Sequence, residues 1–274
     1  MYTGIRIIFN TGGTKTKLAV SRDGQVVGEP IVFDTNQDFD LWLEDMSRNI
    51  ASLRDNNQIA TIGGGIAGVW DERKTKLLRS PNLTEWENRP IKKRMEEIFE
   101  VPVFLHNDVA LEGLGEAIIG AGRRKRIVAF VAVGTGIGGV KIEDGKICPN
   151  VFGFEPGHQI IENDGEFGYL ESFAGGAGMK RAFGKAPEDI SDEEVWEAET
   201  RILAIGLHNI ILLWSPEMLI LSGGVMKSVK LPKLIKMIEE QMQMFPKLPQ
   251  IVPGELTEKA GLYGALEYLK TASK

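Results

Sequence analysis

The stretch Asn10-Thr-Gly-Gly-Thr-Lys-Thr-Lys-Leu-Ala-Val20, preceded by the largely apolar run Ile5 to Phe9, decides the fold. It joins two strand-like runs through a glycine-rich corner, and the same order returns at Ile127 to Val133 followed by Gly134-Thr-Gly-Ile-Gly-Gly139. In each copy a Gly-Thr pair stands eleven residues before the glycine of an Asp-Gly turn, a dipeptide that favours tight β-hairpins. The spacing predicts a duplicated β-hairpin.

The glycine-rich corners are candidate phosphate sites. Glycine lacks a Cβ atom, so a corner built from it can take positive φ angles and present successive N–H groups to an anion. A third glycine-rich segment, Gly223-Gly224, follows the strand-like run Met218 to Leu221. Two corners facing each other across a cleft would suit a nucleoside triphosphate. The residues that we expect to bind nucleotide are Gly12, Gly13, Thr14, Lys15, Gly134, Thr135, Gly136, Gly223 and Gly224.

Composition narrows the class of protein. The chain has 274 residues, 43% of them hydrophobic and 26% charged, as in a globular protein with a sizeable core. The net charge of −6 gives no basic surface for nucleic acid, and the short run Arg123 to Arg126 is typical of a solvated loop. The single cysteine, Cys148, excludes an intrachain disulfide and a cysteine-rich metal cluster. With no apolar run of about 20 residues and no signal peptide, we expect a cytoplasmic protein without membrane contact.

Strand-like and helix-like runs alternate along the chain. Helical spacing of apolar residues appears in the segments 39–53, 91–99, 108–120, 193–214 and 259–269. This order is typical of an α/β fold with parallel strands added to each hairpin, and the duplication predicts two like domains with a cleft between them. We expect a smaller domain over 1–107, joined by a C-terminal helix within 256–274, and a larger domain over 108–255.

Several motifs together resemble a known family. The stretch Asn10 to Val20, the pair Asn107-Asp108, the corner Gly134 to Gly139 and Glu155-Pro-Gly-His158 resemble the ROK family in order and spacing, and the likeness continues to Gly261-Leu-Tyr-Gly-Ala-Leu-Glu267. That family contains bacterial glucokinases and related hexose and N-acetylhexosamine kinases. The resemblance implies duplicated actin-like, ribonuclease H-like ATPase domains, with ATP and Mg²⁺ as cofactors and a sugar as substrate. Relatives are commonly dimers, so a homodimer is one form open to this chain.

Asp108 is the candidate catalytic residue. A sugar hydroxyl attacks phosphorus better as its proton leaves, and a carboxylate at a helix start beside Asn107 could accept that proton. The residues alone leave a second interpretation equally open, in which Asp108 only caps its helix. The resemblance implies the catalytic role, with Asp108 as general base and Asn107 holding a neighbouring hydroxyl.

Carboxylates and an imidazole form the expected sugar pocket. Glu155 and His158 are three residues apart with a glycine between them, and Glu171 follows. Such groups satisfy the donors and acceptors of a buried polyhydroxylated ring. As isolated features, such a histidine is more often a loop residue and such a glutamate more often solvated. Asn82 could equally be an ordinary turn residue after proline. The resemblance assigns sugar binding to Asn82, Asn107, Asp108, Glu155, His158 and Glu171.

Structural zinc is not expected. Many relatives follow the Gly-His pair with three closely spaced cysteines that, with the histidine, hold a zinc ion. The run from Glu166 to Met179 contains no cysteine, so we assign His158 to sugar. Cys148 is more simply a small hydrophobic residue than a ligand.

Asn10 departs from the family pattern. The family places an aspartate here that helps to hold the magnesium ion beside the β- and γ-phosphates. Asparagine keeps the shape of that ligand and loses its charge, and hard cations prefer charged oxygen. We therefore expect a weakened magnesium site at Asn10 and slowed transfer. Asn10→Asp should then raise turnover by at least about tenfold, or ~1.4 kcal/mol in the barrier.

The sequence leads to two functions. The first is ATP-dependent phosphorylation of a hexose or hexose derivative, as in glucokinases. The alternative is a sugar-binding or sugar-sensing protein that kept the pocket and lost transfer because of Asn10. A repressor of the same family would need a DNA-binding helix-turn-helix before the first hairpin, and with nine residues ahead of Asn10 we do not expect one. The identity of the sugar depends on loop shape and pocket volume and is left open.

Overall fold

The computed structural model describes residues 4–272, which divide into two compact units. The first unit takes in 4–119, 149–153 and 258–272, and the second takes in 120–148 and 154–257. The helix that starts at Asp108 falls in the first unit, whereas the sequence led us to expect it in the second.

The elements of the first unit are β1 (Ile5–Thr11), β2 (Lys15–Ser21), β3 (Ile31–Asp34), α1 (Phe39–Leu53), β4 (Ile59–Ile66), β5 (Val69–Trp70), β6 (Leu77–Arg79), α2 (Ile91–Phe99), β7 (Val103–His106), α3 (Asp108–Ile118) and α8 (Ala260–Ala272). Those of the second unit are β8 (Ile127–Val133), β9 (Ile137–Glu143), β10 (Lys146–Ile147), β11 (Ile160–Asn163), β12 (Glu166–Tyr169), α4 (Leu170–Ala174), α5 (Gly176–Phe183), α6 (Glu193–Trp214), β13 (Met218–Ser222), α7 (Leu231–Gln241) and β14 (Gln250–Pro253). Short 3₁₀ turns lie at Thr84–Trp86, Pro156–His158, Pro187–Asp189, Val225–Lys227 and Thr257–Lys259.

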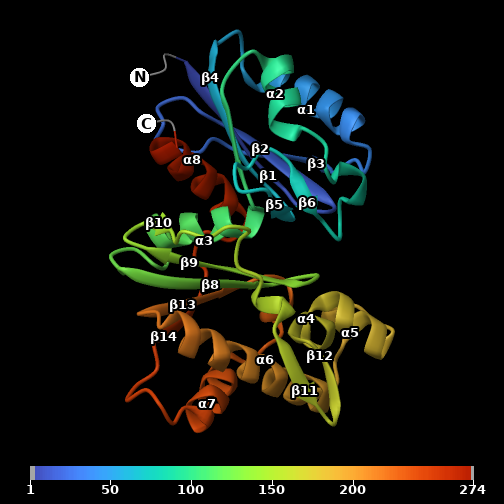
Figure 1. The fold of residues 1–274 in the computed structure, drawn as a ribbon, viewed down its shortest axis with the longest axis vertical. Coiled ribbons are helices and arrows are strands. Elements are labelled where there is room, and N and C mark those ends of the chain that lie inside the picture. The colour runs from blue at the N-terminus through green and yellow to red at the C-terminus, as the bar shows by residue number, and fades with distance from the viewer. Residues whose placement is uncertain (1–3, 273–274) are drawn as a thin grey trace. The chain divides into compact units, whose positions relative to one another are not determined.

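Each unit is built on a five-stranded sheet, and the two sheets share one design (Figure 1). The strand orders are β3-β2-β1-β4-β7 and β10-β9-β8-β13-β14. β1 pairs with β2 as an antiparallel hairpin and with β4 in parallel, and β8 pairs in the same two ways with β9 and β13. Parallel strands are therefore added to each hairpin, as the duplicated sequence predicts.

The core of the first unit forms around aromatic side chains. Phe39 and Trp42, from the buried face of α1, pack with Phe9 of β1 and with Trp86. All four are nearly inaccessible to solvent. The indole N–H of Trp42 donates to the hydroxyl of Thr16 at 3.1 Å, so burial leaves this polar group satisfied.

Helices α3 and α8 cross in direct backbone contact within the first unit, where Figure 1 draws them in green and red. A Cβ atom at Gly115 of α3 would lie 2.2 Å from the carbonyl oxygen of Ala260, and one at Gly264 of α8 would lie 1.7 Å from that of Leu111. The crossing therefore requires glycine on both helices. It is the physical reason why α3 belongs with the first unit.

The second unit packs α6 and α7 against its sheet. The buried residues of α6, such as Leu203 and Leu207, join those of β8 and β13 in one apolar core. The hairpin of β11 and β12 leads directly into α4 and α5. In the described residues, no helix is both long enough and apolar enough to cross a membrane.

Candidate active site

Asn10 occupies a tight cradle near the end of β1. Its Nδ2 donates a hydrogen bond to Oε1 of Glu112 on α3 at 3.1 Å. Its Oδ1 is buried, and nothing within residues 4–272 hydrogen-bonds to it. A Cβ atom at Gly65 would lie 2.5 Å from this Oδ1, and one at Gly261 would lie 2.5 Å from Nδ2. Since a buried acceptor without a partner is costly, the cradle indicates a place for a water or a ligand.

The start of α3 brings Asn107 and Asp108 to the same region of the first unit. Asn107 is the N-cap, because its Oδ1 accepts from the N–H of Ala110 at 2.9 Å, and its Nδ2 donates to the carbonyl of Gly68 at 3.1 Å. The capping role that the sequence left open for Asp108 therefore belongs to Asn107. Asp108 is the first helical residue, and its Cα lies 2.7 Å from the Cβ position of Gly65. A carboxylate is favoured there by the helix dipole.

Glu112 lies one helical turn after Asp108 and was not singled out from the sequence. The pKa of Glu112 is raised to about 7, chiefly by burial and next by the charge of Asp108. The charge of Lys17 and the hydrogen bond from Asn10 act in the opposite direction. The spacing of four residues from Asp108 was the available signal, because it places both carboxyl groups on one face of a helix.

Two loops of the first unit lie beside these residues. The hydroxyl of Ser80 donates to the carbonyl of Ala67 at 2.8 Å, which ties the loop at 80–83 to the turn at 67–68 that follows β4. Asn82 is exposed and packs on the first glycine corner, since a Cβ atom at Gly13 would lie 2.4 Å from its Cβ. Asn82 and Asn107 thus lie near the glycine corner and near Gly68 respectively.

The first glycine corner is closed by its own backbone. The N–H of Gly12 donates to the carbonyl of Lys15 at 3.0 Å, and the carbonyl of Thr14 accepts from Thr35 at 2.9 Å. Lys15 reaches outward, with its Nζ 2.5 Å from Oδ1 of Asp34 and its side chain 58% exposed. An exposed ion pair of this kind contributes little stability, so Lys15 is able to exchange its partner for a phosphate.

The second glycine corner follows β8. The carbonyl of Gly134 accepts from the N–H of Gly176 at 2.8 Å, and that of Thr135 accepts from Ala177 at 2.9 Å. These bonds tie the corner to the first residues of α5. A Cβ atom at Gly134 would meet no atom within 4 Å, so the corner is open on that side.

Gly223 and Gly224 lie at the same end of this sheet. They follow β13, which runs parallel to β8 with Ser222 beside Ala132. Gly223 has a φ of +99°, and a Cβ atom there would lie 2.3 Å from the carbonyl oxygen of Val133. Only glycine fits such a position. The carboxyl ends of parallel strands are where ligands bind in open α/β sheets.

The three residues predicted to hold sugar in the second unit gather around one imidazole. Nδ1 of His158 lies 3.7 Å from Oε2 of Glu155, and its Nε2 lies 3.8 Å from Oε1 of Glu171. The other oxygen of Glu171 accepts from the N–H of Ile137 at 3.1 Å, which fixes it beside the second corner. Loss of solvent raises the pKa of Glu155, while His158 lowers it and Glu171 raises it. The cluster offers both donors and acceptors to a polar ligand.

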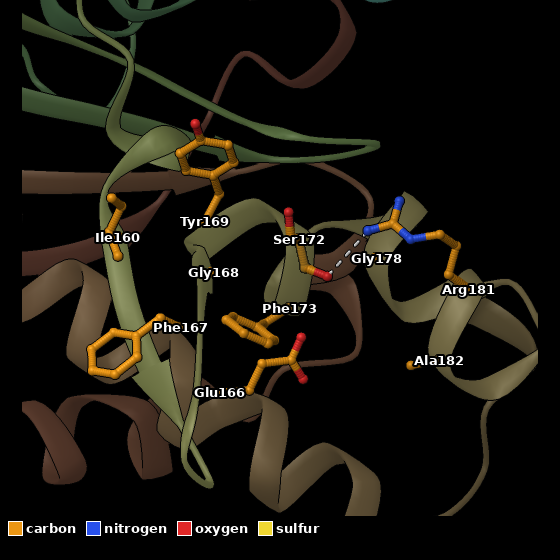
Figure 2. A pocket seen from close by; sticks show the side chains of 10 residues that line it. All are labelled: Ile160, Glu166, Phe167, Gly168, Tyr169, Ser172, Phe173, Gly178, Arg181 and Ala182. Carbon is orange, nitrogen blue, oxygen red and sulfur yellow. Dashed lines mark hydrogen bonds between the residues drawn. The ribbon is translucent and has the colours of Figure 1, made fainter.

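A hollow of about 630 Å³ lies on the neighbouring hairpin (Figure 2). Aromatic side chains of β12 and α4 line it, together with Arg181, whose guanidinium donates to the carbonyl of Ser172 at 3.4 Å. Tyr169 also faces the predicted sugar residues, with its ring centroid 4.9 Å from that of His158. None of the residues predicted to bind sugar or nucleotide lines this hollow.

Comparison with known proteins identifies the family. The model of the ROK family matches residues 3–272. The chain belongs to the ROK family. A glucokinase of Thermotoga maritima is 26% identical over 304 residues, covering 94% of this chain and 95% of the relative. The structure of a ROK hexokinase from Thermus thermophilus is 25% identical, with a TM-score of 0.80, and covers 98% of this chain and all of that one.

A third comparison bears on the fold. A ROK glucokinase from Streptomyces griseus, solved with glucose and AMPPNP, is 22% identical with a TM-score of 0.79, covering 96% of this chain and 98% of that one. Together the comparisons confirm the predicted family, the predicted actin-like α/β ATPase fold and the predicted enzyme class, a sugar kinase. The roles assigned to single residues stay predictions.

ROK kinases are expected to use magnesium, and the donors present bear on that expectation. In the described part of the chain no three histidine, cysteine or carboxylate side chains are grouped closely enough to hold a metal by themselves. A nucleotide-bound magnesium ion needs fewer protein ligands, because it keeps waters and phosphate oxygens. The buried, unpartnered Oδ1 of Asn10 is a suitable oxygen for such an ion or its water. Asn10 therefore fits a supporting role at a magnesium ion.

Proposed function

We propose that this ROK protein transfers the γ-phosphoryl group of ATP to a hydroxyl of a hexose or hexose derivative, with Asp108 as general base. The observation that carries the proposal is the position of Asp108. It is the first residue of α3, next to the cradle of Asn10, and Asn107 already supplies the helix cap. Capping of α3 is therefore supplied by Asn107, and the position of Asp108 beside the cradle is what supports its role as general base.

Each group of residues is assigned one part of the phosphoryl transfer. Asp108 takes the proton as the sugar oxygen bonds to the γ-phosphorus, and the bond from that phosphorus to the bridging oxygen breaks to leave ADP. Glu155, His158 and Glu171 hold other hydroxyls of the sugar, with Asn82 and Asn107 as further contacts. The phosphates are assigned to the two glycine corners and to Gly223-Gly224, through N–H groups other than those of Gly12 and Gly134, which bond within their own corners. Magnesium, when bound near Asn10, would offset charge on the phosphates.

The relatives support this assignment by their named activities and ligands. The glucokinase of Thermotoga maritima and the hexokinase of Thermus thermophilus both act on hexoses by name, and the Streptomyces griseus structure was solved with glucose and a nucleotide analogue. A sugar-sensing protein without transfer is the second candidate, favoured by the uncharged residue at position 10.

A sugar panel tests the proposal. Purified protein is mixed with magnesium, ATP and one hexose or N-acetylhexosamine at a time, and ADP release is followed. We expect sugar-dependent release that Asp108→Ala lowers by about 10²–10⁴-fold. Calorimetric sugar binding without release of ADP, at any protein concentration, would instead identify a sensor.

A further inference from the structure

We propose that Glu112 is a positioning residue that works with Asn10 as a pair, so that the acidic group absent from β1 is supplied by α3. The inference rests on the proposed phosphoryl transfer. One hydrogen bond joins these residues, which are 102 positions apart in the sequence: Nδ2 of Asn10 donates to Oε1 of Glu112 at 3.1 Å.

This bond decides how the amide of Asn10 is turned. The two ends of an amide have nearly the same shape, so packing alone does not choose between them. If the amide were reversed, its Oδ1 would face the carboxyl oxygen of Glu112, and an ionised Glu112 would oppose it with a second acceptor. With Nδ2 on Glu112, the acceptor Oδ1 is the atom left without a partner within residues 4–272.

The cradle requires glycine on both sides of the amide. A Cβ atom at Gly65 would lie 2.5 Å from Oδ1 and one at Gly261 would lie 2.5 Å from Nδ2, so the amide packs directly against the backbone of both residues. Glu112 therefore fixes which atom of Asn10 is offered to a ligand. Oxygen is the donor atom that magnesium and its bound waters require.

The same pair changes what Asn10→Asp should do. An aspartate at position 10 would place one of its oxygens against Oε1 of Glu112, so two carboxyl groups would meet where a donor and an acceptor meet now. Two buried carboxyl groups in contact cannot both be ionised without repulsion. The single substitution is therefore expected to destabilise the protein, and the gain in turnover expected from sequence alone requires a change at Glu112 as well.

Four proteins make the test: the parent, Asn10→Asp, Glu112→Gln and the exchanged pair Asn10→Asp with Glu112→Gln. In the exchanged pair the glutamine amide donates to the aspartate, so the bond is kept with its polarity reversed. Glu96→Gln is the matched control, because Glu96 is a glutamate of the same unit whose Oε1 accepts a backbone N–H from Val103 at 3.2 Å. Thermal melting and calorimetric binding of AMPPNP, with and without magnesium, are the readouts.

We expect Asn10→Asp to lower the melting temperature and the exchanged pair to recover it. We expect Glu112→Gln to weaken the magnesium-dependent part of nucleotide binding by about tenfold while leaving binding without magnesium and sugar affinity unchanged. The exchanged pair should restore magnesium-dependent binding, and Glu96→Gln should alter none of these values.

Additive effects of the two substitutions on melting and on binding would overturn the pairing, as would parental magnesium dependence in Glu112→Gln. If Glu112→Gln does not fold, the comparison of Asn10→Asp with the exchanged pair still decides the question. Because the readouts are binding and melting, they also separate this inference from the proposed function. A parent that phosphorylates no sugar defeats the proposed function alone, and the coupling between positions 10 and 112 is then still measured.

Discussion

The imidazole of His106 accepts a hydrogen bond from the backbone N–H of Asn107 at 2.9 Å. This bond ties the last residue of β7 to the residue that caps α3, and so holds Asp108 at the helix start. His106 is 7% exposed, and its ring meets that of Tyr268 of α8 edge-on, with 5.3 Å between the ring centroids. Burial lowers the pKa of His106 to about 3, helped by the charge of Lys74, so the ring stays neutral at physiological pH.

Replacing His106 should separate its packing from its hydrogen bond. His106→Phe keeps an aromatic ring and leaves the N–H of Asn107 without an acceptor, which should cost about 1–3 kcal/mol of unfolding free energy and lower turnover. His106→Asn keeps an acceptor atom close to the position of Nδ1 and should retain more of the turnover at similar stability. Urea denaturation and ADP release measure the two effects. Equal turnover in both variants would show that the bond does not position Asp108.

The same residue predicts a dependence of stability on pH. The pKa of His106 is about 3 in the folded state and near its ordinary 6.5 in the unfolded chain, so the unfolded chain binds the extra proton between these values. Its contribution is therefore present above pH 6.5 and lost as the pH falls below it. Between pH 7.5 and pH 5, His106→Phe should lose less unfolding free energy than the parent does. A parallel loss in both proteins would contradict this assignment.

Asp108→Asn should separate catalysis from capping. As Asn107 is the N-cap, the substitution removes one first-turn charge and should change stability by less than about 1 kcal/mol. Turnover should fall by about 10²–10⁴-fold, because a positioned base is lost, with nucleotide affinity nearly unchanged. Asn107→Ala is the complementary variant, expected to lose about 0.5–2 kcal/mol of stability through the missing cap. If the Asp108→Asn variant keeps its turnover, Asp108 is not the general base.

The cluster around His158 should govern sugar affinity. His158→Ala or Glu155→Gln removes one partner of a polar contact and should weaken sugar binding by about 1–3 kcal/mol, with less effect on nucleotide. Glu166→Gln is the control, since Glu166 is exposed on the neighbouring hairpin of β11 and β12 and lines the hollow in Figure 2. Calorimetry with the preferred sugar decides the matter. Unaltered affinity in both cluster variants would mean that the pocket lies elsewhere.

Glu199 of α6 should make the protein less stable at alkaline pH. Its side chain is buried, its Oε1 has no hydrogen-bond partner in the described residues, and burial raises its pKa to about 8. The folded state therefore holds a proton that the unfolded chain releases near pH 4.5, so stability falls as the pH rises from 4.5 to 8.

Glu199→Gln should remove this slope, raising the unfolding free energy at pH 8.5 by an amount on the order of a few kcal/mol and changing it far less at pH 5. Denaturation of both proteins at the two pH values is the measurement. Glu188→Gln, at an exposed position of the same unit, serves as the control. A slope that persists in Glu199→Gln would assign the effect to another group.

Local patterns in the sequence predicted much of this structure. The helices at 39–53, 91–99 and 193–214 have the bounds expected from apolar spacing, and the Asp144-Gly145 turn takes the positive φ angles that its dipeptide favours. Gly63 to Gly65 lie within β4 in the structure, although glycine is not a strand-favouring residue. Leu269 and the ring of Phe9 fill the space above Gly63 and Gly64, so these glycines admit large neighbours. Such packing is decided by residues distant in sequence.

The pairing of Asn10 with Glu112 was hidden for the same reason. Each residue is unremarkable within its own segment, and only the close approach of β1 to α3 joins them. The chemistry of the motifs could be assigned from the resemblance, because Asn107-Asp108 and Glu155 to His158 are local. The consequence of an asparagine at position 10 could not be assigned from the resemblance, because it depends on Glu112, which only the fold brings next to Asn10.

The place of α8 has a consequence for the order in which the protein is made. This helix is the last element of the chain, yet Gly261 borders the amide of Asn10, Leu269 covers Gly63, and Gly264 meets α3. A ribosome therefore releases residues 120–257 before the first unit can complete its core. During synthesis, the face of the N-terminal sheet that α8 covers stays exposed until α8 has been made. Chaperones that bind apolar surface can bind this face during that time.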